Sequence, residues 1–169
     1  MGLKKLFIDI PAVINSGVPA DEIKCEYLFH NENHGAFSLL EVAQFAVYCR
    51  QCKDAFCVSA CPREAIEHQE NGTIKRYNMR CVGCKSCVLA CPFGTIFPEV
   101  INYITSKCDF CLNQLNEYKE YSPACVQSSP PGGFTIREFE KEEPDKNIFF
   151  AGEHLAIKSH SWRMKEGKL

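Results

Sequence analysis

The stretch CVGCKSCVLACP, residues 81–92, decides the fold that this sequence predicts. It has two residues between its first three cysteines, three residues before the last one, and a proline directly after it. Two similar groups flank this run: Cys49, Cys52, Cys57 and Cys61 with Pro62 before it, and Cys108, Cys111 and Cys125 after it. The three groups hold all but one of the 12 cysteines in the 169-residue chain, and Cys25 stands alone.

The spacing within residues 81–92 indicates which metal group it binds. Cys-x2-Cys-x2-Cys-x3-Cys-Pro is the bacterial pattern for [4Fe-4S] clusters, in which three closely spaced thiolates bind one cluster and the fourth reaches another. The proline is tolerated because an N–H in the first turn of a helix has no helical partner. We therefore expect the first two groups to exchange their last cysteines. The expected ligands of cluster one are Cys49, Cys52, Cys57 and Cys91, and those of cluster two are Cys81, Cys84, Cys87 and Cys61.

The third group lacks a fourth thiol, and Cys25 is the only cysteine left to supply one. We expect cluster three to be bound by Cys108, Cys111, Cys125 and Cys25. Ser129 and Pro130 stand where a Cys-Pro would complete the group, and residues 11–19, where a partner group would be expected, contain no cysteine. We interpret Ser129 as the relic of a deleted fourth site. The sequence thus predicts three [4Fe-4S] clusters, twelve cysteine ligands and no catalytic residue.

Other readings of these cysteines stay open at this point. Paired Cys-x2-Cys motifs also bind structural zinc, and cysteine-rich chains in oxidising compartments form disulfides. Cys25 could be a small buried hydrophobic residue, which would leave the third group with a three-iron cluster or without metal. Ser129 could bind iron as an alkoxide, although an oxygen of such high pKa is a poor match for soft iron.

Composition excludes several other classes of protein. With 46% hydrophobic and 24% charged residues the chain is typical of a globular protein, and its formal net charge of -2 does not favour a nucleic-acid partner. There is no apolar run of about 18 residues, no secretion signal and no twin arginine, so we expect a cytoplasmic location. Phosphate-cradling and dinucleotide-binding glycine motifs are also missing from the sequence, and electron relay is the function that remains.

The cysteine motifs resemble those of a known family. Residues 49–62, 81–87 and 123–126 are similar to the iron-sulfur subunits of molybdopterin- and tungstopterin-dependent oxidoreductases, which include the electron-transfer subunits of dimethyl sulfoxide reductase and formate dehydrogenase. That family typically has four cysteine groups and four clusters in two pseudo-symmetric ferredoxin-like halves. Here the first group is reduced to Cys25 and the last has lost its fourth thiol. A three-cluster version of this kind resembles the small subunit of tungsten-dependent class II benzoyl-CoA reductase.

The resemblance implies a function and partners. The chain would be a non-catalytic subunit that passes single electrons between a ferredoxin, or a further electron-transfer subunit, and a large catalytic subunit that carries a pterin-bound tungsten or molybdenum. A free-standing polyferredoxin that shuttles between enzymes is an alternative, and an interaction module held together by zinc is another. Basic residues next to the ligands in sequence would offset the negative charge of the clusters: Lys53, Arg63, Arg80, Lys85 and Lys107.

The expected fold class is α+β, with tandem ferredoxin-like [4Fe-4S] halves built from short hairpins and short helices. We expect residues 1–48 and 108–140 to form a single-cluster half, residues 49–107 a two-cluster half, and residues 141–169 a C-terminal tail. The sequence predicts strands at 3–10, 73–78 and 134–139, helices at 63–68 and 112–119, a hairpin of 94–100 with 102–106, and a linker at 138–146. The type of element at 39–48 is left open because its apolar residues have no clean period.

Overall fold

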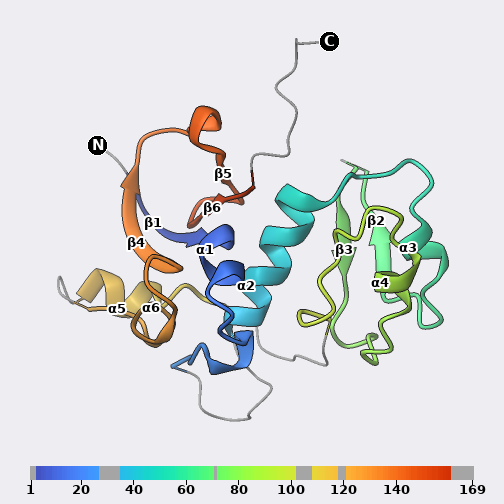
Figure 1. Cartoon of the computed structure of the whole chain (residues 1–169), viewed down its shortest axis with the longest axis horizontal. Helices are drawn as coiled ribbons and strands as arrows, with labels where there is room; N and C mark the ends of the chain where they lie inside the picture. Colours follow the sequence, from blue (N-terminus) through green and yellow to red (C-terminus); the bar gives the residue numbers. More distant parts are fainter. Residues whose placement is uncertain (1–2, 27–34, 71, 102–107, 118–120, 161–169) are drawn as a thin grey trace.

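A computed structural model describes residues 3–26, 35–70, 72–101, 108–117 and 121–160 of the chain. Its largest element is a four-stranded sheet with the strand order β4-β1-β6-β5. The strands are β1 (Leu3–Asp9), β4 (Phe134–Phe139), β5 (Ile148–Phe150) and β6 (Leu155–Lys158). β1 pairs antiparallel with β4 and parallel with β6, and β5 pairs antiparallel with β6. The first and last strands of the described chain therefore lie side by side (Figure 1).

β1 is buried on both faces of this sheet. Leu6 and Ile8 pack into the main core, whereas Phe7 points to the other face and packs in a small cluster that contains Phe139. This alternation is the period-two pattern of a strand, and its apolar residues on both faces are typical of a central strand. The α1 helix (Ile10–Asn15) follows at once, because the Asp9 carboxylate accepts a hydrogen bond of 3.1 Å from the Ala12 N–H and caps the helix.

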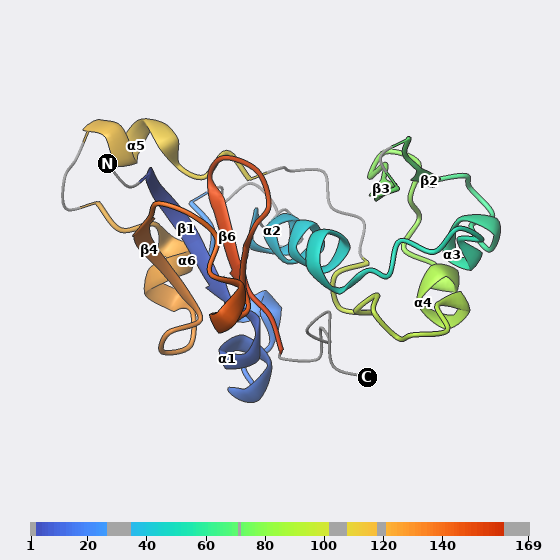
Figure 2. The same ribbon diagram turned by 90° about the horizontal axis from the view of Figure 1, so that it is seen from above.

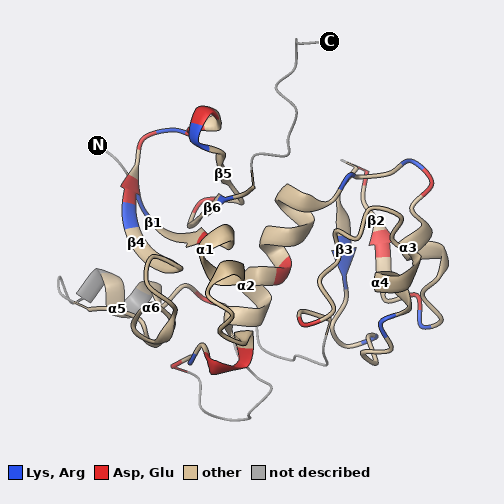
Figure 3. Ribbon diagram, viewed as in Figure 1, with Lys and Arg blue, Asp and Glu red and all other residues tan. Residues whose placement is uncertain are grey.

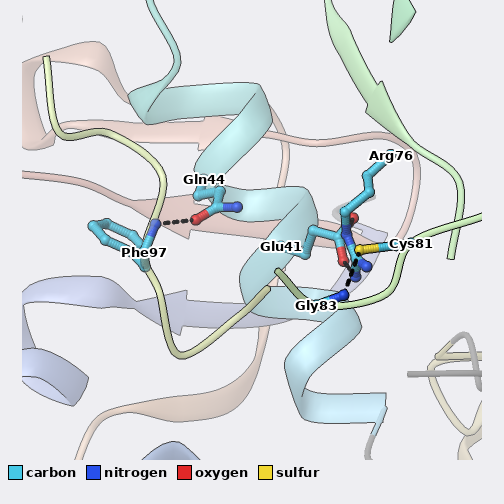
Figure 4. Close-up of polar contacts among 6 residues, drawn as sticks. All are labelled: Glu41, Gln44, Arg76, Cys81, Gly83 and Phe97. Carbon is cyan, nitrogen blue, oxygen red and sulfur yellow. Dashed lines mark hydrogen bonds and ion pairs between the residues drawn. The ribbon is translucent and has the colours of Figure 1, made fainter. Parts of the chain in front are cut away.

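The α2 helix (Gly35–Ala43) lies between the sheet and the region that contains the first two cysteine groups (Figures 1 and 2). It continues as a π-turn, η2 (Gln44–Tyr48), which ends directly before Cys49. Leu39, Leu40 and Ala43 pack into the main core, and Phe45 belongs to the second core. The buried Gln44 side chain accepts a hydrogen bond of 2.8 Å from the Phe97 N–H (Figure 4). The continuous rod formed by α2 and η2 is therefore attached to both regions.

The region around the first two cysteine groups has its own small core. It contains α3 (Phe56–Ser59), α4 (Ser86–Ala90) and an antiparallel hairpin of β2 (Ile66–His68) with β3 (Ile74–Arg76). Buried apolar residues of the core are in contact with the cysteines themselves, including Cys81 and Cys87. The remaining elements are α5 (Leu112–Glu117), α6 (Ala124–Ser128) and two 3-10 turns, η1 (Ala20–Glu22) and η3 (Pro144–Lys146). Among the described residues no helix is long and apolar enough to cross a bilayer.

Several predictions from the sequence are confirmed. The expected strands at 3–10, 73–78 and 134–139 correspond to β1, β3 and β4, and the expected helix at 112–119 corresponds to α5, with residues 118 and 119 outside the described residues. The chain is a mixture of short helices and short strands, as an α+β class requires. The undecided stretch 39–48 is the second half of α2 followed by η2.

Three predictions are wrong. Residues 63–68 do not form a helix, because Glu64 adopts a left-handed conformation (φ 48°) and residues 66–68 pair with β3 as a strand. Residues 94–100 form turns rather than a strand, and their expected partner 102–106 lies outside the described residues. The segment expected to be a linker and tail supplies η3, β5 and β6, and β6 takes an inner place in the main sheet. Strand pairing decides the structure of 66–68 and of β6, and local sequence patterns do not reveal it.

The position of β6 yields a prediction about stability. Ile157 is fully buried in the main core, so Ile157→Ala should lower the free energy of unfolding by about 2–5 kcal/mol through lost burial and the cavity left behind. Ile14→Ala is the matched control, because that side chain is 50% exposed, and it should change stability far less. Chemical denaturation of the two variants measures the difference. Equal losses would show that residues 155–158 do not belong to the folded sheet.

Candidate metal centres

The three cysteine groups use the same local loop. In the first Cys-x2-Cys pair of each group the third residue has a left-handed backbone, and its N–H donates to the sulfur of the first cysteine. The donors are Gln51, Gly83 and Phe110, with φ angles of 50°, 68° and 61°, and they lie 3.4, 3.4 and 3.2 Å from the sulfurs of Cys49, Cys81 and Cys108. Only glycine adopts this conformation without strain. The third group, which is incomplete in sequence, thus has the loop of the two complete groups.

The two Cys-Pro turns are also equivalent. Three residues after Cys61 and Cys91 the chain is left-handed, at Glu64 and Gly94, and each of these N–H groups donates to the carbonyl of its cysteine at 3.2 Å. The Cys61 sulfur accepts from the Ala65 N–H at 3.2 Å, and the Cys91 sulfur lies 3.4 Å from the Thr95 hydroxyl. Burial raises the pKa of Cys91, but the hydrogen bonds from Thr95 and neighbouring N–H groups outweigh it, so the pKa is lowered overall. The turn at Cys91 therefore favours a thiolate.

Cys61 lies with the second group rather than with its own. It lines a small pocket together with Cys81, Cys84 and Cys87. Burial raises the pKa of Cys87 to about 11, and the nearby charges of Cys81, Cys57 and Cys61 contribute in the same direction. The structure thus brings together the four residues that the exchange rule predicts for cluster two.

Cys91 in turn lies with the first group. Burial is the main cause that raises the pKa of Cys49, and the charges of Cys52 and Cys91 add to it. The pKa of Cys57 is raised by burial and by the charges of Cys49 and Cys91. These mutual influences place Cys49, Cys52, Cys57 and Cys91 in one neighbourhood, as the crosswise exchange requires.

Cys25 lies beside the third cysteine group. A second small pocket is lined by Cys25, Cys108, Cys111 and Cys125. Gly35 at the start of α2 closes it, since a Cβ there would lie 3.3 Å from the Cys25 sulfur and 3.4 Å from the Cys108 Cβ. Burial raises the pKa of Cys108 and that of Cys125 to about 12. These thiols are protonated near neutral pH without metal, so metal binding must release protons.

Residues on either side of Cys25 hold it beside α6. The Lys24 N–H donates to the Ser128 hydroxyl at 2.8 Å, and that hydroxyl donates to the Ala124 carbonyl at 2.7 Å. Glu26 accepts from the Ala124 N–H at 3.1 Å and from the Tyr121 hydroxyl at 2.8 Å. Sequence reasoning missed these residues, because no motif connects positions about a hundred residues apart. Cys25 is therefore held next to Cys125 by contacts that do not involve either sulfur.

Ser129 has a different role from that of a ligand. Its hydroxyl accepts from the Phe134 N–H at 3.1 Å and donates to the Val126 carbonyl at 3.2 Å. The described residues that line the third cavity do not include it. Its oxygen occupies the turn before β4 much as the Cys61 sulfur accepts the Ala65 N–H. A hydroxyl supplies this turn bond, so the chain needs no thiol at this position.

The donor sets fit a cluster. Within the described part of the chain, no three His, Cys, Asp or Glu side chains converge on a point where one ion could be held. The cysteines instead surround cavities, four to each of the two cavities given above. Four soft thiolates with backbone N–H groups directed at sulfur are the donors that a [4Fe-4S] cube requires.

Comparison with known proteins agrees with this geometry. Residues 40–139 match a protein family described as the 4Fe-4S dicluster domain. The match contains the cysteines of all three groups, and of the 12 cysteines it leaves out Cys25. The chain belongs to this family and binds [4Fe-4S] clusters.

Individual relatives are iron-sulfur or electron-transport proteins by name. YsaA of Escherichia coli, named for electron transport, is 42% identical over 100 residues, which cover 57% of this chain and 59% of YsaA. PhsB of Salmonella typhi, named as a thiosulfate reductase electron transfer subunit, is 35% identical over 57% of this chain and 50% of its own length. A protein of Proteus vulgaris, named as a probable iron-sulfur subunit of the Frd operon, is 32% identical over 65% of this chain and 80% of its own. The chain thus spans little more than half the length of the first two.

The adjacent residues Ser128 and Ser129 allow a matched test of how Cys25 is held. Ser128→Ala removes the acceptor for the Lys24 N–H, so the cluster at Cys25 should be lost faster under a chelator, while the other clusters persist. Ser129→Ala should lower global stability by about 1 kcal/mol and leave the lifetime of that cluster unchanged. Electron paramagnetic resonance of the reduced protein follows each centre. Identical decay in both variants would contradict these separate roles.

Proposed function

We propose that the chain relays single electrons through three [4Fe-4S] clusters as a non-catalytic subunit of an oxidoreductase complex. Cluster one would be bound by Cys49, Cys52, Cys57 and Cys91, cluster two by Cys81, Cys84, Cys87 and Cys61, and cluster three by Cys108, Cys111, Cys125 and Cys25. The observation that carries the proposal is the cavity where Cys25 meets the third group, since it completes a third set of four thiols. Residues 49–107 would hold two clusters, and the sheet with α6 would hold the third.

Full ligation by cysteine supports relay over catalysis. Each cubane iron has one thiolate in this scheme, so no iron keeps an open position for a substrate. What the chain's own residues do is bind the clusters, limit their contact with water and set their potentials through hydrogen bonds and nearby charge. The N–H bonds to Cys49, Cys81 and Cys108 are examples of such control.

The continuous rod formed by α2 and η2 links the proposed centres. Gly35, Ala36 and Leu39 at the start of α2 line the third cavity, and η2 at its far end leads into Cys49. Phe45 packs in the core that surrounds the second group. Because this rod is packed against both regions, it keeps the distance between the clusters constant, and electron transfer depends on that distance.

The charge of the clusters would be large for this chain. Each oxidised cube with four thiolates carries about -2, which would bring the formal charge from -2 to about -8. Lysines and arginines lie on the loops around α3, α4 and β3 (Figure 3). They would offset part of this charge and make contact with partners of negative potential.

The proposed partners follow from resemblance and from the relatives. The name of PhsB describes an electron transfer subunit, which supports a separate catalytic subunit here. We propose that this subunit carries a pterin-bound tungsten or molybdenum, that electrons arrive from a ferredoxin or another subunit, and that a benzoyl-CoA reductase is a suitable complex. A free-standing shuttle would instead be purified as a stable monomer without a large partner.

Reductive titration of the anaerobically purified protein tests the proposal. The wild type should take up about three electrons per chain, one for each cube. Cys25→Ala and Cys111→Ala should both lose the same paramagnetic signal, and Cys91→Ala should lose the signal that Cys49→Ala removes. An uptake of about two electrons in the wild type, or a Cys91→Ala variant that loses the same signal as Cys87→Ala, would contradict the ligand sets.

A further inference from the structure

One buried ion pair lies against the second proposed centre. The side chain of Arg76, on β3, has no exposed surface, and its Nε donates to the Glu41 Oε1 on α2 at 3.0 Å. Its Nη2 donates to the other carboxylate oxygen, so the guanidinium and the carboxylate face each other with two parallel bonds (Figure 4). This pair connects α2 with the β2–β3 hairpin.

Stability alone is a weak reason for such a pair. Taking two charges out of water carries a penalty of several kcal/mol per ion, and apolar side chains of similar volume often do as well or better. Apolar Phe45 and Ile74 line the same pocket as the pair, although polar side chains also line it. A buried charge at this position therefore indicates a role other than stability.

This other role involves Cys81, a proposed ligand of cluster two. The Cys81 side chain lies beside the Arg76 guanidinium in Figure 4. An arginine side chain keeps its proton in proteins, so a positive group faces this sulfur. Cys81 is itself buried, and its sulfur accepts a further bond of 3.4 Å from the Gly83 N–H.

The equivalent cysteines differ in this respect. Cys49 and Cys108 occupy the same loop position and also accept a backbone N–H. Among the described residues Arg76 is the one buried arginine, and it lies beside Cys81 of the second group.

We propose that Arg76 sets the reduction potential of the cluster bound by Cys61, Cys81, Cys84 and Cys87, and that Glu41 is the positioning residue that holds its guanidinium against the Cys81 sulfur. The inference rests on the proposed ligand set. Reduction adds negative charge to the cluster, and a fixed positive donor on a thiolate stabilises that reduced form. The cluster should therefore have a higher potential than it would without Arg76.

An anaerobic redox titration of the cluster-loaded protein, followed by electron paramagnetic resonance, tests the inference. Arg76→Gln should lower the ratio of reduced to oxidised cluster two about tenfold at a fixed potential, which for one electron is about 59 mV. Arg76→Lys keeps the positive charge but loses the planar guanidinium with its two parallel bonds, so its potential should lie between those of the wild type and Arg76→Gln. Glu41→Gln weakens the two bonds that hold the guanidinium against Cys81, so it should move the potential in the same direction as Arg76→Gln and by less. A purely structural role would leave the potential of both variants unchanged.

Arg80 is the matched control. It directly precedes Cys81 in sequence, but its side chain is 52% exposed and binds Glu67 at 2.7 Å. Solvent screens its charge, so Arg80→Gln should change the potential much less than Arg76→Gln. Equal shifts in the two variants, or no shift in Arg76→Gln and Arg76→Lys, would overturn the role of Arg76.

The ligand set of cluster two and the role of Arg76 can be refuted separately. A Cys84→Ser variant that perturbs none of the paramagnetic centres would refute the ligand set, and the role of Arg76 with it. A wild type with three intact centres and an unchanged potential in the Arg76 variants would refute only the role of Arg76. Iron content and circular dichroism of each variant show whether its clusters and fold are retained.

Discussion

The bond between a thiolate and iron is the constraint on which the rest of this structure depends. The chain has two small cores joined by α2 and η2, and cysteines form part of the second core. Loops as short as these gain little from burial alone, so binding energy for a cluster becomes folding energy. The buried thiols have raised pKa values, which shows that the sites are apolar enough to protect a cluster once their protons are released.

The third centre depends on a different kind of contact. The first two groups are neighbours along the chain, whereas Cys25 is separated from Cys125 by a hundred residues. The main sheet closes this distance, because β1 pairs with β4 and the chain enters β4 shortly after α6. Ser128 and Glu26 then fix the segment around Cys25 on α6. The sheet thus brings a distant thiol to an incomplete group.

How far sequence reasoning succeeds depends on how local each feature is. The Cys-x2-Cys loops and the Cys-Pro turns follow from spacing within a dozen residues, and the spatial exchange of Cys61 and Cys91 was predicted from spacing alone. The strand at 66–68 and the two C-terminal strands were missed, because they are too short for a clear pattern and because β6 gains its inner place by pairing with β1 at the other end of the described chain. Basic residues next to the ligands in sequence were expected to tune the clusters. The buried arginine that lies beside Cys81 is Arg76, which no spacing rule indicates.

Quantifying iron and acid-labile sulfide in anaerobically purified protein tests the central claim most directly, namely that twelve cysteines in three sets bind three cubes. The account predicts about twelve irons and about twelve sulfides per chain. About eight of each would show that the cavity at Cys25 does not hold a [4Fe-4S] cluster. About sixteen would show a fourth cluster for which the chain has no cysteines left, and either result would contradict the account.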